Sequence, residues 1–208
     1  MREILIQEDV KLVKERLKLF EAKTGCELLL VVARASDPYP GAAYRFGIIS
    51  AFLLNLVVSY YFEFHHSFIW PLLFILTTVL MIWVGHFTWA KRLALSSWEV
   101  DRECMEKSIE YFHTLGTSKV SHKVTAMIMV SVLEKKILVL VDELLKSKIT
   151  QEELGELVTI MKTHFRKGNM GLGFTQSIQS LEEKILKDFG GKVSTNEPSE
   201  LMDTIHFL

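Results

Sequence analysis

The sequence has very few cysteines, and the two present give no sign of redox or metal chemistry. Cys26 and Cys104 lie far apart in a chain of 208 residues, and no CxxC pair occurs. Both belong to polar segments that we place below in a reducing compartment, where structural disulfides are rare. We therefore interpret both cysteines as small buried hydrophobic residues.

An excess of positive charge is also missing. The chain has 24 lysines and arginines against 25 aspartates and glutamates, which gives a formal net charge of −1 at pH 7. A nucleic-acid-binding domain usually carries a basic stripe or patch, because it has to neutralise phosphates. The sequence has no such stripe, and we therefore expect no nucleic-acid partner.

Several sequence signatures of catalysis are absent as well. The chain contains no Gly-x-Ser-x-Gly, no His-Glu-x-x-His and no glycine-rich loop that ends in Lys-Ser or Lys-Thr. The glycines between Gly168 and Gly173 follow a predicted helix, whereas a phosphate-binding loop follows a strand. Serine and cysteine hydrolase chemistry and phosphate cradling therefore have no support in the sequence.

Charge is missing altogether from two long stretches in the first half of the chain. No Asp, Glu, Lys or Arg occurs from Phe46 to Phe62, or from Ser67 to Ala90. As helices, these stretches of about 17 and 24 residues reach about 26 and 36 Å, against a hydrocarbon core of roughly 30 Å. Two helices buried on all sides in a soluble core would need far more chain than remains. We predict two transmembrane helices, at 44–62 and 67–90.

The link between the two stretches is so short that the predicted helices must be antiparallel neighbours, a hairpin. Lysines and arginines such as Arg45 and Lys91 flank its outer ends, and the tip has none. By the positive-inside rule both polar segments then face the cytoplasm, which predicts a multi-pass protein of the cytoplasmic (inner) membrane. Aromatic residues near the helix ends suit interfacial anchors, although Trp83 fits a core position equally well.

The two polar segments, 1–43 and 91–208, are predicted to form one discontinuous α/β domain into which the hairpin 44–90 is inserted. The strand in the first segment, 27–34, needs partners that only the second segment supplies. Its nearly continuous apolar run is typical of a central strand covered on both faces. The remaining predicted elements are helices at 7–23, 98–115, 150–165 and 174–189 and strands at 125–132 and 136–142, with a loosely held tail around 196–198.

This order of elements includes several short motifs that a known family shares. They are Thr24-Gly25-Cys26-Glu27 before the first strand, the basic turn Glu134-Lys135-Lys136, the closing Phe165, Gly168 and Gly171-Leu172, and Asn196-Glu197-Pro198 in the tail. Together they resemble the TPM domain family, named for a thylakoid lumen protein, a photosystem II repair protein and a nematode receptor modulator. A bacterial branch of that family carries a membrane hairpin after the first strand.

The resemblance implies a small sheet with helices on its faces and a role in maintaining or modulating membrane complexes. Some relatives hydrolyse phosphate esters. Two departures concern the acidic positions expected for such an activity. The acidic residue before the second strand is replaced by Ser121-His122-Lys123-Val124, and the family's Asp-Arg-Gly is here Asp142-Glu143-Leu144.

Two carboxylates are the candidate site residues. Asp37 and Asp142 both lie near the C-terminal end of a predicted strand, and carboxylates that converge beyond a sheet can bind Ca²⁺ or Mg²⁺. Capping of backbone turns is the other interpretation of both residues. At the hairpin tip, Glu63, His65 and His66 are either zinc or copper ligands or ordinary polar tip residues.

Our preferred prediction is a membrane-anchored, non-catalytic interaction or maintenance factor for membrane protein complexes. Its partners would be the lipid bilayer and other membrane proteins, it would need no cofactor, and self-association stays open. The alternative is a divalent-metal-dependent phosphatase of phosphomonoesters that uses Asp37 and Asp142. A transporter or channel subunit is a third class, and two helices per chain would then require oligomerisation.

Overall fold

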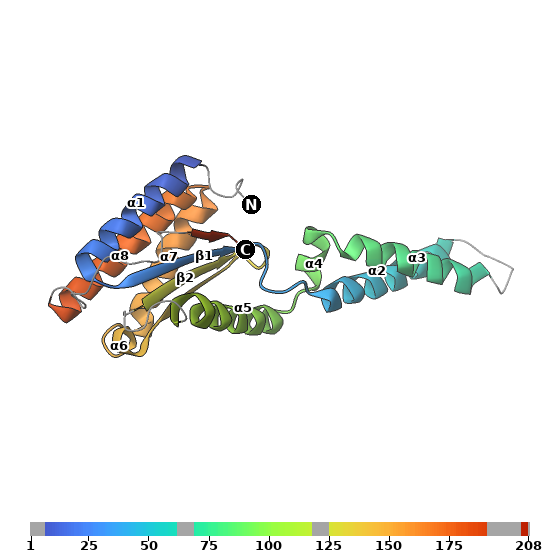
Figure 1. Ribbon diagram of the computed structural model, residues 1–208. Coiled ribbons are helices and arrows are strands. Elements are labelled where there is room, and N and C mark those ends of the chain that lie inside the picture. The colour runs from blue at the N-terminus through green and yellow to red at the C-terminus, as the bar shows by residue number, and fades with distance from the viewer. Residues whose placement is uncertain (1–6, 62–68, 118–124, 191–204, 208) are drawn as a thin grey trace. The chain divides into compact units, whose positions relative to one another are not determined.

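The computed structural model describes residues 7–61, 69–117, 125–190 and 205–207. These residues form a mixed α/β structure with one four-stranded sheet. The chain divides into two compact units, one made of residues 1–36 with 104–208 and the other of residues 37–103. The first contains the sheet and the second is helical (Figure 1).

The sheet consists of β1 (Glu27–Ala33), β2 (Thr125–Ser131), β3 (Lys136–Val141) and β4 (Ile205–Phe207), in the order β3-β2-β1-β4. β1 runs parallel to β2 and β4, whereas β2 and β3 are antiparallel. All seven residues of β1 are buried, which confirms the prediction of a central strand covered on both faces.

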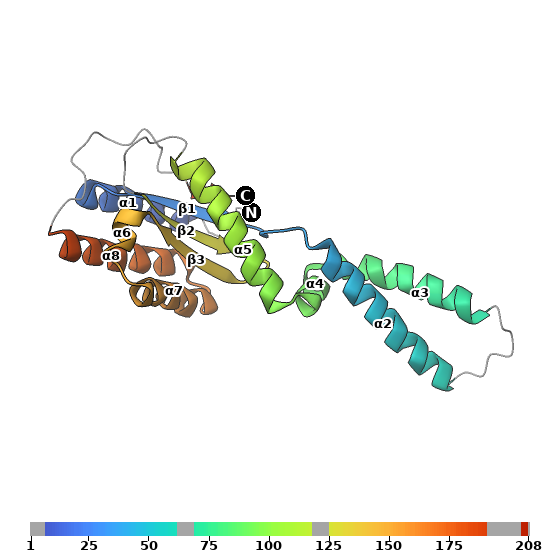
Figure 2. The same ribbon diagram turned by 90° about the horizontal axis from the view of Figure 1, so that it is seen from below.

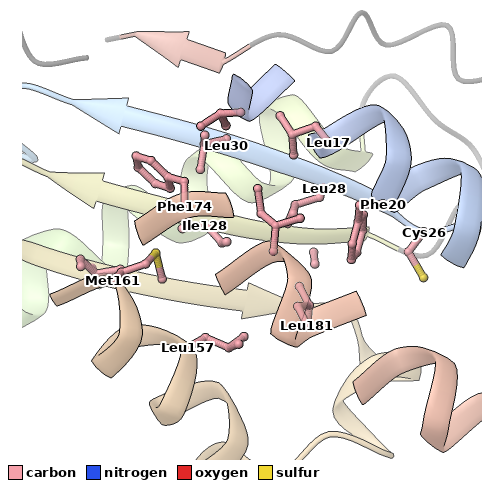
Figure 3. Close-up of a cluster of buried hydrophobic side chains, with 14 of the residues drawn as sticks. Leu17, Phe20, Cys26, Leu28, Leu30, Ile128, Leu157, Met161, Phe174 and Leu181 are labelled. Atoms are coloured by element: carbon pink, nitrogen blue, oxygen red, sulfur yellow. The ribbon is translucent and has the colours of Figure 1, made fainter. Parts of the chain in front are cut away.

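One face of the sheet is covered by α1 (Gln7–Thr24), α7 (Gln151–Arg166) and α8 (Met170–Phe189), as Figure 1 shows. Side chains from these helices and from alternate strand positions form the main hydrophobic core. Figure 3 shows Phe20 and Phe174 within it, both at most 1% exposed. Burial of side chains of this size contributes roughly 1.5–3 kcal/mol each.

The other face is covered by the second half of α5 (Ser97–Tyr111) and by the π-helical turn η1 (Phe112–Thr117) that follows it (Figure 2). Leu29, Val31 and Met127 point to this side, where Tyr111 and Phe112 pack against them. The sheet therefore has helices on both faces, as the sequence predicted.

Helix ends in this unit follow ordinary capping chemistry. Thr150 and Glu153 form the predicted capping box at the start of α7. Gly25 after α1 and Gly190 after α8 have positive φ of 71° and 67°, the left-handed conformation that glycine adopts at no steric cost. These ends lie within one or two residues of their predicted positions.

Three features of this unit differ from the predicted pattern. β4, for which no strand was predicted, pairs with Leu30–Val32 of β1. The short helix α6 (Glu143–Lys146) was not predicted, and α8 begins at Met170, four residues before the predicted start. Elements of three or four residues are too short to show a periodicity, and β4 depends on a pairing distant in sequence.

A buried carboxylate joins the first helix to the last. Glu182 of α8 is 5% exposed, and its two oxygens accept from Arg16 Nη2 at 2.7 Å and Lys23 Nζ at 2.9 Å. Both cations belong to α1. The two charge-assisted hydrogen bonds compensate the cost of burying the carboxylate and hold the two helices in register.

The second unit contains α2 (Pro40–Tyr61), α3 (Ile69–Gly85) and α4 (Thr88–Ala94). α2 is long and apolar enough to cross a membrane, and α3 reaches that length only together with α4. The helix predicted at 67–90 is not continuous, because the chain bends by 101° between α3 and α4. The bend lies after Gly85. The backbone of Phe87 is extended, and this interrupts the helical hydrogen bonding between α3 and α4.

Candidate functional site

Asp142 acts as a structural cap. Its Oδ1 accepts from the backbone N–H of Leu145 at 2.9 Å, at the N-terminus of α6, and its Oδ2 accepts from the N–H of Thr125 at 3.1 Å. The Asp142 N–H in turn donates to the Thr125 carbonyl at 3.0 Å. Both carboxylate oxygens therefore stabilise the junction of β2, β3 and α6.

Asp37 has a comparable local role. Its Oδ2 accepts from the N–H of Tyr39 at 2.7 Å and forms a turn directly before α2. Tyr39 itself has a positive φ of 48°. Pro40, with its fixed φ and missing N–H, then suits the first position of the helix. This is the turn-capping interpretation of Asp37.

The structure does not bring Asp37 and Asp142 together. β3 is antiparallel to β2 while β1 is parallel to it, so the carboxyl ends of β1 and β3 lie at opposite ends of the sheet. Asp142 adjoins Thr125, the register partner of Glu27 at the start of β1, whereas Asp37 follows the end of β1. The seven-residue length of β1, about 23 Å, separates these two ends.

Glu134 stabilises the end of the sheet where β1 and β2 end, close to Asp37 in sequence. Its Oε1 accepts from the N–H of Ser36 at 2.7 Å, and its Oε2 accepts from the Ser131 hydroxyl. Glu134 stands in the turn between β2 and β3, where Lys135 has a φ of 53°. This carboxylate, too, is engaged in closing the sheet.

Among the described residues, no group of three or more His, Cys, Asp or Glu side chains is arranged to hold a metal ion. The candidates Glu63, His65 and His66, the segment Ser121–Val124 and the tail motif Asn196-Glu197-Pro198 lie outside the described residues. His86 lies in the break after α3, where its Nδ1 is 2.9 Å from the Ile82 carbonyl oxygen.

Asp142 offers a direct test of the capping role. Asp142→Ala removes both acceptors and is expected to lower the free energy of unfolding of the sheet unit by about 1 kcal/mol. Asp142→Asn keeps one acceptor and should lose less. Melting curves of the full chain in detergent check both values. A metal site would instead appear as a rise in melting temperature with Mg²⁺ or Ca²⁺ that both variants abolish.

Both cysteines are buried and free, as predicted. Burial raises the pKa of the Cys26 thiol from 9.0 to about 12. The Thr24 hydrogen bond opposes this rise, and the Asp142 charge adds a smaller increase. A neutral thiol in this position packs as a hydrophobic side chain and is a poor nucleophile.

The raised pKa of Cys26 predicts a pH dependence of stability. Below pH 9 the thiol is protonated in both states, so its contribution is fully present; as the pH rises towards about 12, only the unfolded state ionises and the contribution is lost. The difference in unfolding free energy between wild type and Cys26→Ala should therefore fall by roughly 1 kcal/mol per pH unit above pH 9. Urea titrations at several pH values measure it, and a constant difference would contradict the shift.

The second unit is held together by close contact between α2 and α3. Ala43, Gly47, Ala51 and Asn55 recur every fourth residue on α2, and all four are buried. A Cβ on Gly47 would lie 2.5 Å from Cγ1 of Ile82, within α3. Small residues spaced by four let two helix backbones approach closely, as they do in membrane helix pairs.

Further contacts show that α2 and α3 are antiparallel. A Cβ on Gly85 at the end of α3 would lie 2.5 Å from the Ala43 carbonyl oxygen near the start of α2. Towards the other end, Asn55 Nδ2 donates to Thr77 Oγ1 at 2.7 Å. Figure 1 shows the two helices side by side. The four-residue spacing is visible in the sequence, but our sequence reasoning missed it and noted only Asn55 as a polar residue in an apolar stretch.

Most of the remaining surface of the helix pair is apolar and exposed. Only 22% of the most apolar window of α2 is buried within the chain. The large hydrophobic side chains that are more than half exposed on the two helices are Tyr44, Ile48, Ile49, Phe52, Leu53, Leu56, Val57, Tyr60 and Tyr61 on α2 and Leu72, Ile75, Leu76, Val79, Leu80 and Trp83 on α3. An apolar surface of this extent has to be shielded from water, because contiguous apolar patches on soluble monomers seldom exceed a few hundred Å².

Charged residues lie near the start of α2 and in the segment that follows α3. Arg45 binds Glu99 with two hydrogen bonds of 2.9 and 2.5 Å, and Lys91 Nζ donates to the Pro38 carbonyl oxygen at 2.7 Å. The Arg45 guanidinium holds the pKa of the Glu99 carboxyl below its usual range. The charged residues at the start of α2 and those that follow α3 are therefore in contact within this unit.

Comparison with known proteins gives information on the fold of this chain but not on its function. No protein-family model matches this chain, and neither does any curated relative. A solved structure that does match is the NMR structure of the BA42 protein from the psychrophilic bacterium Bizionia argentinensis. The sequences are 12% identical, the match covers 98% of this chain and 94% of the other, and the TM-score is 0.58. At that identity the likeness shows the fold alone.

Proposed function

We propose that this chain is a membrane-anchored α/β protein, held by a hairpin of α2 with α3 and α4. The observation that carries the proposal is the exposed apolar surface of the two packed helices, which carries no charge from Phe46 to Tyr61 or from Ile69 to Ala90. α2 and α3 are about 33 and 26 Å long, close to the roughly 30 Å of a hydrocarbon core.

The environment that best accounts for this exposed apolar surface of α2 and α3 is lipid. A core helix in a soluble protein is buried on most of its circumference, whereas α2 is buried along one narrow stripe of small residues. That stripe supplies the close packing on which helix association in lipid depends, and the Asn55–Thr77 hydrogen bond satisfies polar groups at the same interface.

Sidedness follows from the charges at the ends of the pair. Arg45, Lys91 and Arg92 belong to the end where α2 starts and α4 begins, so the positive-inside rule places that end in the cytoplasm. The sheet domain is continuous in sequence with that end. We therefore propose a multi-pass protein of the cytoplasmic membrane whose α/β domain, of the TPM type, faces the cytoplasm.

The activity we propose is non-catalytic: the anchored domain binds other membrane proteins and helps to maintain their complexes. Two observations support this choice. The carboxylates Asp37 and Asp142 are used as backbone caps, and the resemblance to the TPM family implies work on membrane complexes. Anchoring raises the effective concentration of the domain near such partners without any new contact.

The test is a pull-down of the tagged full chain from membranes in mild detergent, with mass spectrometry. The matched control carries the same tag on an unrelated two-helix anchor at equal expression. We expect the same membrane proteins to be enriched in repeated experiments over that control. Recovery of nothing above the control would contradict the interaction role, and a second, differently tagged copy in the eluate would establish self-association.

The metal-dependent phosphatase, predicted as the alternative, has no observation in its favour, since Asp37 and Asp142 lie at opposite ends of the sheet. A phosphomonoester assay on the purified full chain, with and without Mg²⁺ or Ca²⁺, distinguishes the two functions. Metal-dependent turnover that Asp142→Asn abolishes would replace our proposal with the enzyme.

A further inference from the structure

The short helix α4 has two different sides. Ala90 is completely buried, and the Trp89 ring contacts Phe46 of α2 edge to face at a centroid distance of 5.5 Å. Trp89 and Leu93 are nonetheless 55% and 74% exposed. These two residues lie four positions apart, on one face of the helix, and Arg92 belongs to the same face.

The direction of α4 also differs from that of α3. The bend of 101° turns α4 nearly perpendicular to the helix that precedes it. If α3 crosses the bilayer, α4 then runs along the membrane surface. A helix in that position buries its apolar side chains at the boundary between headgroups and acyl chains, and Trp is the residue type most typical of that depth.

The charges of α4 fit a phospholipid surface. The helix contains Lys91 and Arg92 and no acidic residue. Every phospholipid carries a phosphate, and the long side chains of lysine and arginine reach it while their stems stay in the apolar layer. Phe87, between the two helices, is also exposed, at 48%, and its ring contacts that of the exposed Trp83 of α3 at a centroid distance of 5.4 Å.

We propose that α4 lies in the headgroup layer of the cytoplasmic leaflet, with Trp89 and Leu93 at the acyl boundary and Arg92 beside lipid phosphates. The inference rests on the proposed membrane hairpin and deepens it. In this position α4 fixes the depth of α3, since deeper insertion would bring the charged side chains of Lys91 and Arg92 into the hydrocarbon core.

Depth-dependent fluorescence quenching tests the proposal on the full chain in phospholipid vesicles. A thiol-reactive fluorophore is attached to one of three variants: Leu93→Cys on α4, Leu76→Cys on the outer face of α3, or Lys162→Cys on the surface of α7. Cys26 and Cys104 are at most 1% exposed, so the introduced cysteine takes the label. Quenchers are nitroxide lipids labelled near the headgroup or at mid-chain, and iodide in the water.

We expect position 93 to lose most fluorescence to the headgroup-side nitroxide, position 76 to the mid-chain nitroxide, and position 162 to iodide. Quenching of position 93 by iodide alone, with position 76 still quenched from mid-chain, would overturn the inference and leave the anchor intact. Mid-chain quenching at position 93 would also overturn it, because α4 would then be inside the core. Iodide quenching at all three positions would overturn the membrane hairpin itself.

Discussion

Replacing Gly85 with alanine is expected to force α2 and α3 apart. The added Cβ would lie 2.5 Å from the Ala43 carbonyl oxygen and 3.1 Å from its carbonyl carbon and Cα, all backbone atoms of α2. Backbone cannot turn aside as a side chain can, so the helices must separate. Overpacking of this kind costs about 1–3 kcal/mol. Gly47→Ala should act in the same direction, since its Cβ would lie 2.7 Å from the backbone N and Cα of Ile82.

The chain supplies a matched control and a local reporter. Gly41 belongs to the same helix α2, but a Cβ there meets nothing within 4 Å, so Gly41→Ala should leave the helix pair unchanged. All four tryptophans lie in the helical unit, at positions 70, 83, 89 and 98. Thermal melting in detergent followed by tryptophan fluorescence therefore reports on this unit. Equal melting temperatures for Gly85→Ala and Gly41→Ala would contradict the close packing.

Glu182→Ala is expected to lower the stability of the sheet unit by about 3 kcal/mol. The substitution removes the carboxylate that Arg16 and Lys23 share, and the Arg16 side chain, 17% exposed, then has to keep its charge in a largely buried position. It also removes the two ionic hydrogen bonds that join α1 to α8. Unpaired buried charge costs more than the lost hydrogen bonds, and for that reason the effect exceeds that of an ordinary surface substitution.

The neighbouring residue gives the control for this prediction. Glu183 is exposed, where it accepts from Gln179, and Glu183→Ala should change stability by less than about 0.5 kcal/mol. The readout is the reactivity of Cys26 and Cys104, which are buried in the sheet unit and become accessible only when it unfolds. Thiol labelling during a urea titration gives the midpoint for each variant. Coinciding midpoints for the two variants would show that the buried ion cluster contributes nothing.

The sequence was sufficient to predict the elements whose signal is local. The buried run Leu28–Val32, the capping box at Thr150 and the stop at Gly25 all lie where their residue chemistry predicts. Hydrophobic periodicity and capping act over a few residues, so the sequence contains them directly. The same holds for the burial of Cys26 and Cys104.

Features that depend on distant parts of the chain were not predicted. For Asp37 and Asp142 the sequence left two interpretations open, turn capping and a shared metal site. The metal-site alternative treated all carboxyl ends of strands alike, although a strand antiparallel to its neighbour ends at the opposite edge. β4 owes its position to pairing with β1, far away in sequence. The bend between α3 and α4 falls within a stretch that contains no Asp, Glu, Lys or Arg, where the absence of charge gives no boundary.

The most direct test of the account is extraction of membranes with alkaline sodium carbonate. Cells that express the full chain are lysed, the membranes are washed with carbonate and the suspension is ultracentrifuged. Carbonate removes proteins held only by surface charge but not helices embedded in lipid. If α2 and α3 form a lipid-embedded pair, the chain stays in the pellet with known integral proteins. Its release into the supernatant would contradict the membrane anchor and the cytoplasmic sidedness inferred from it.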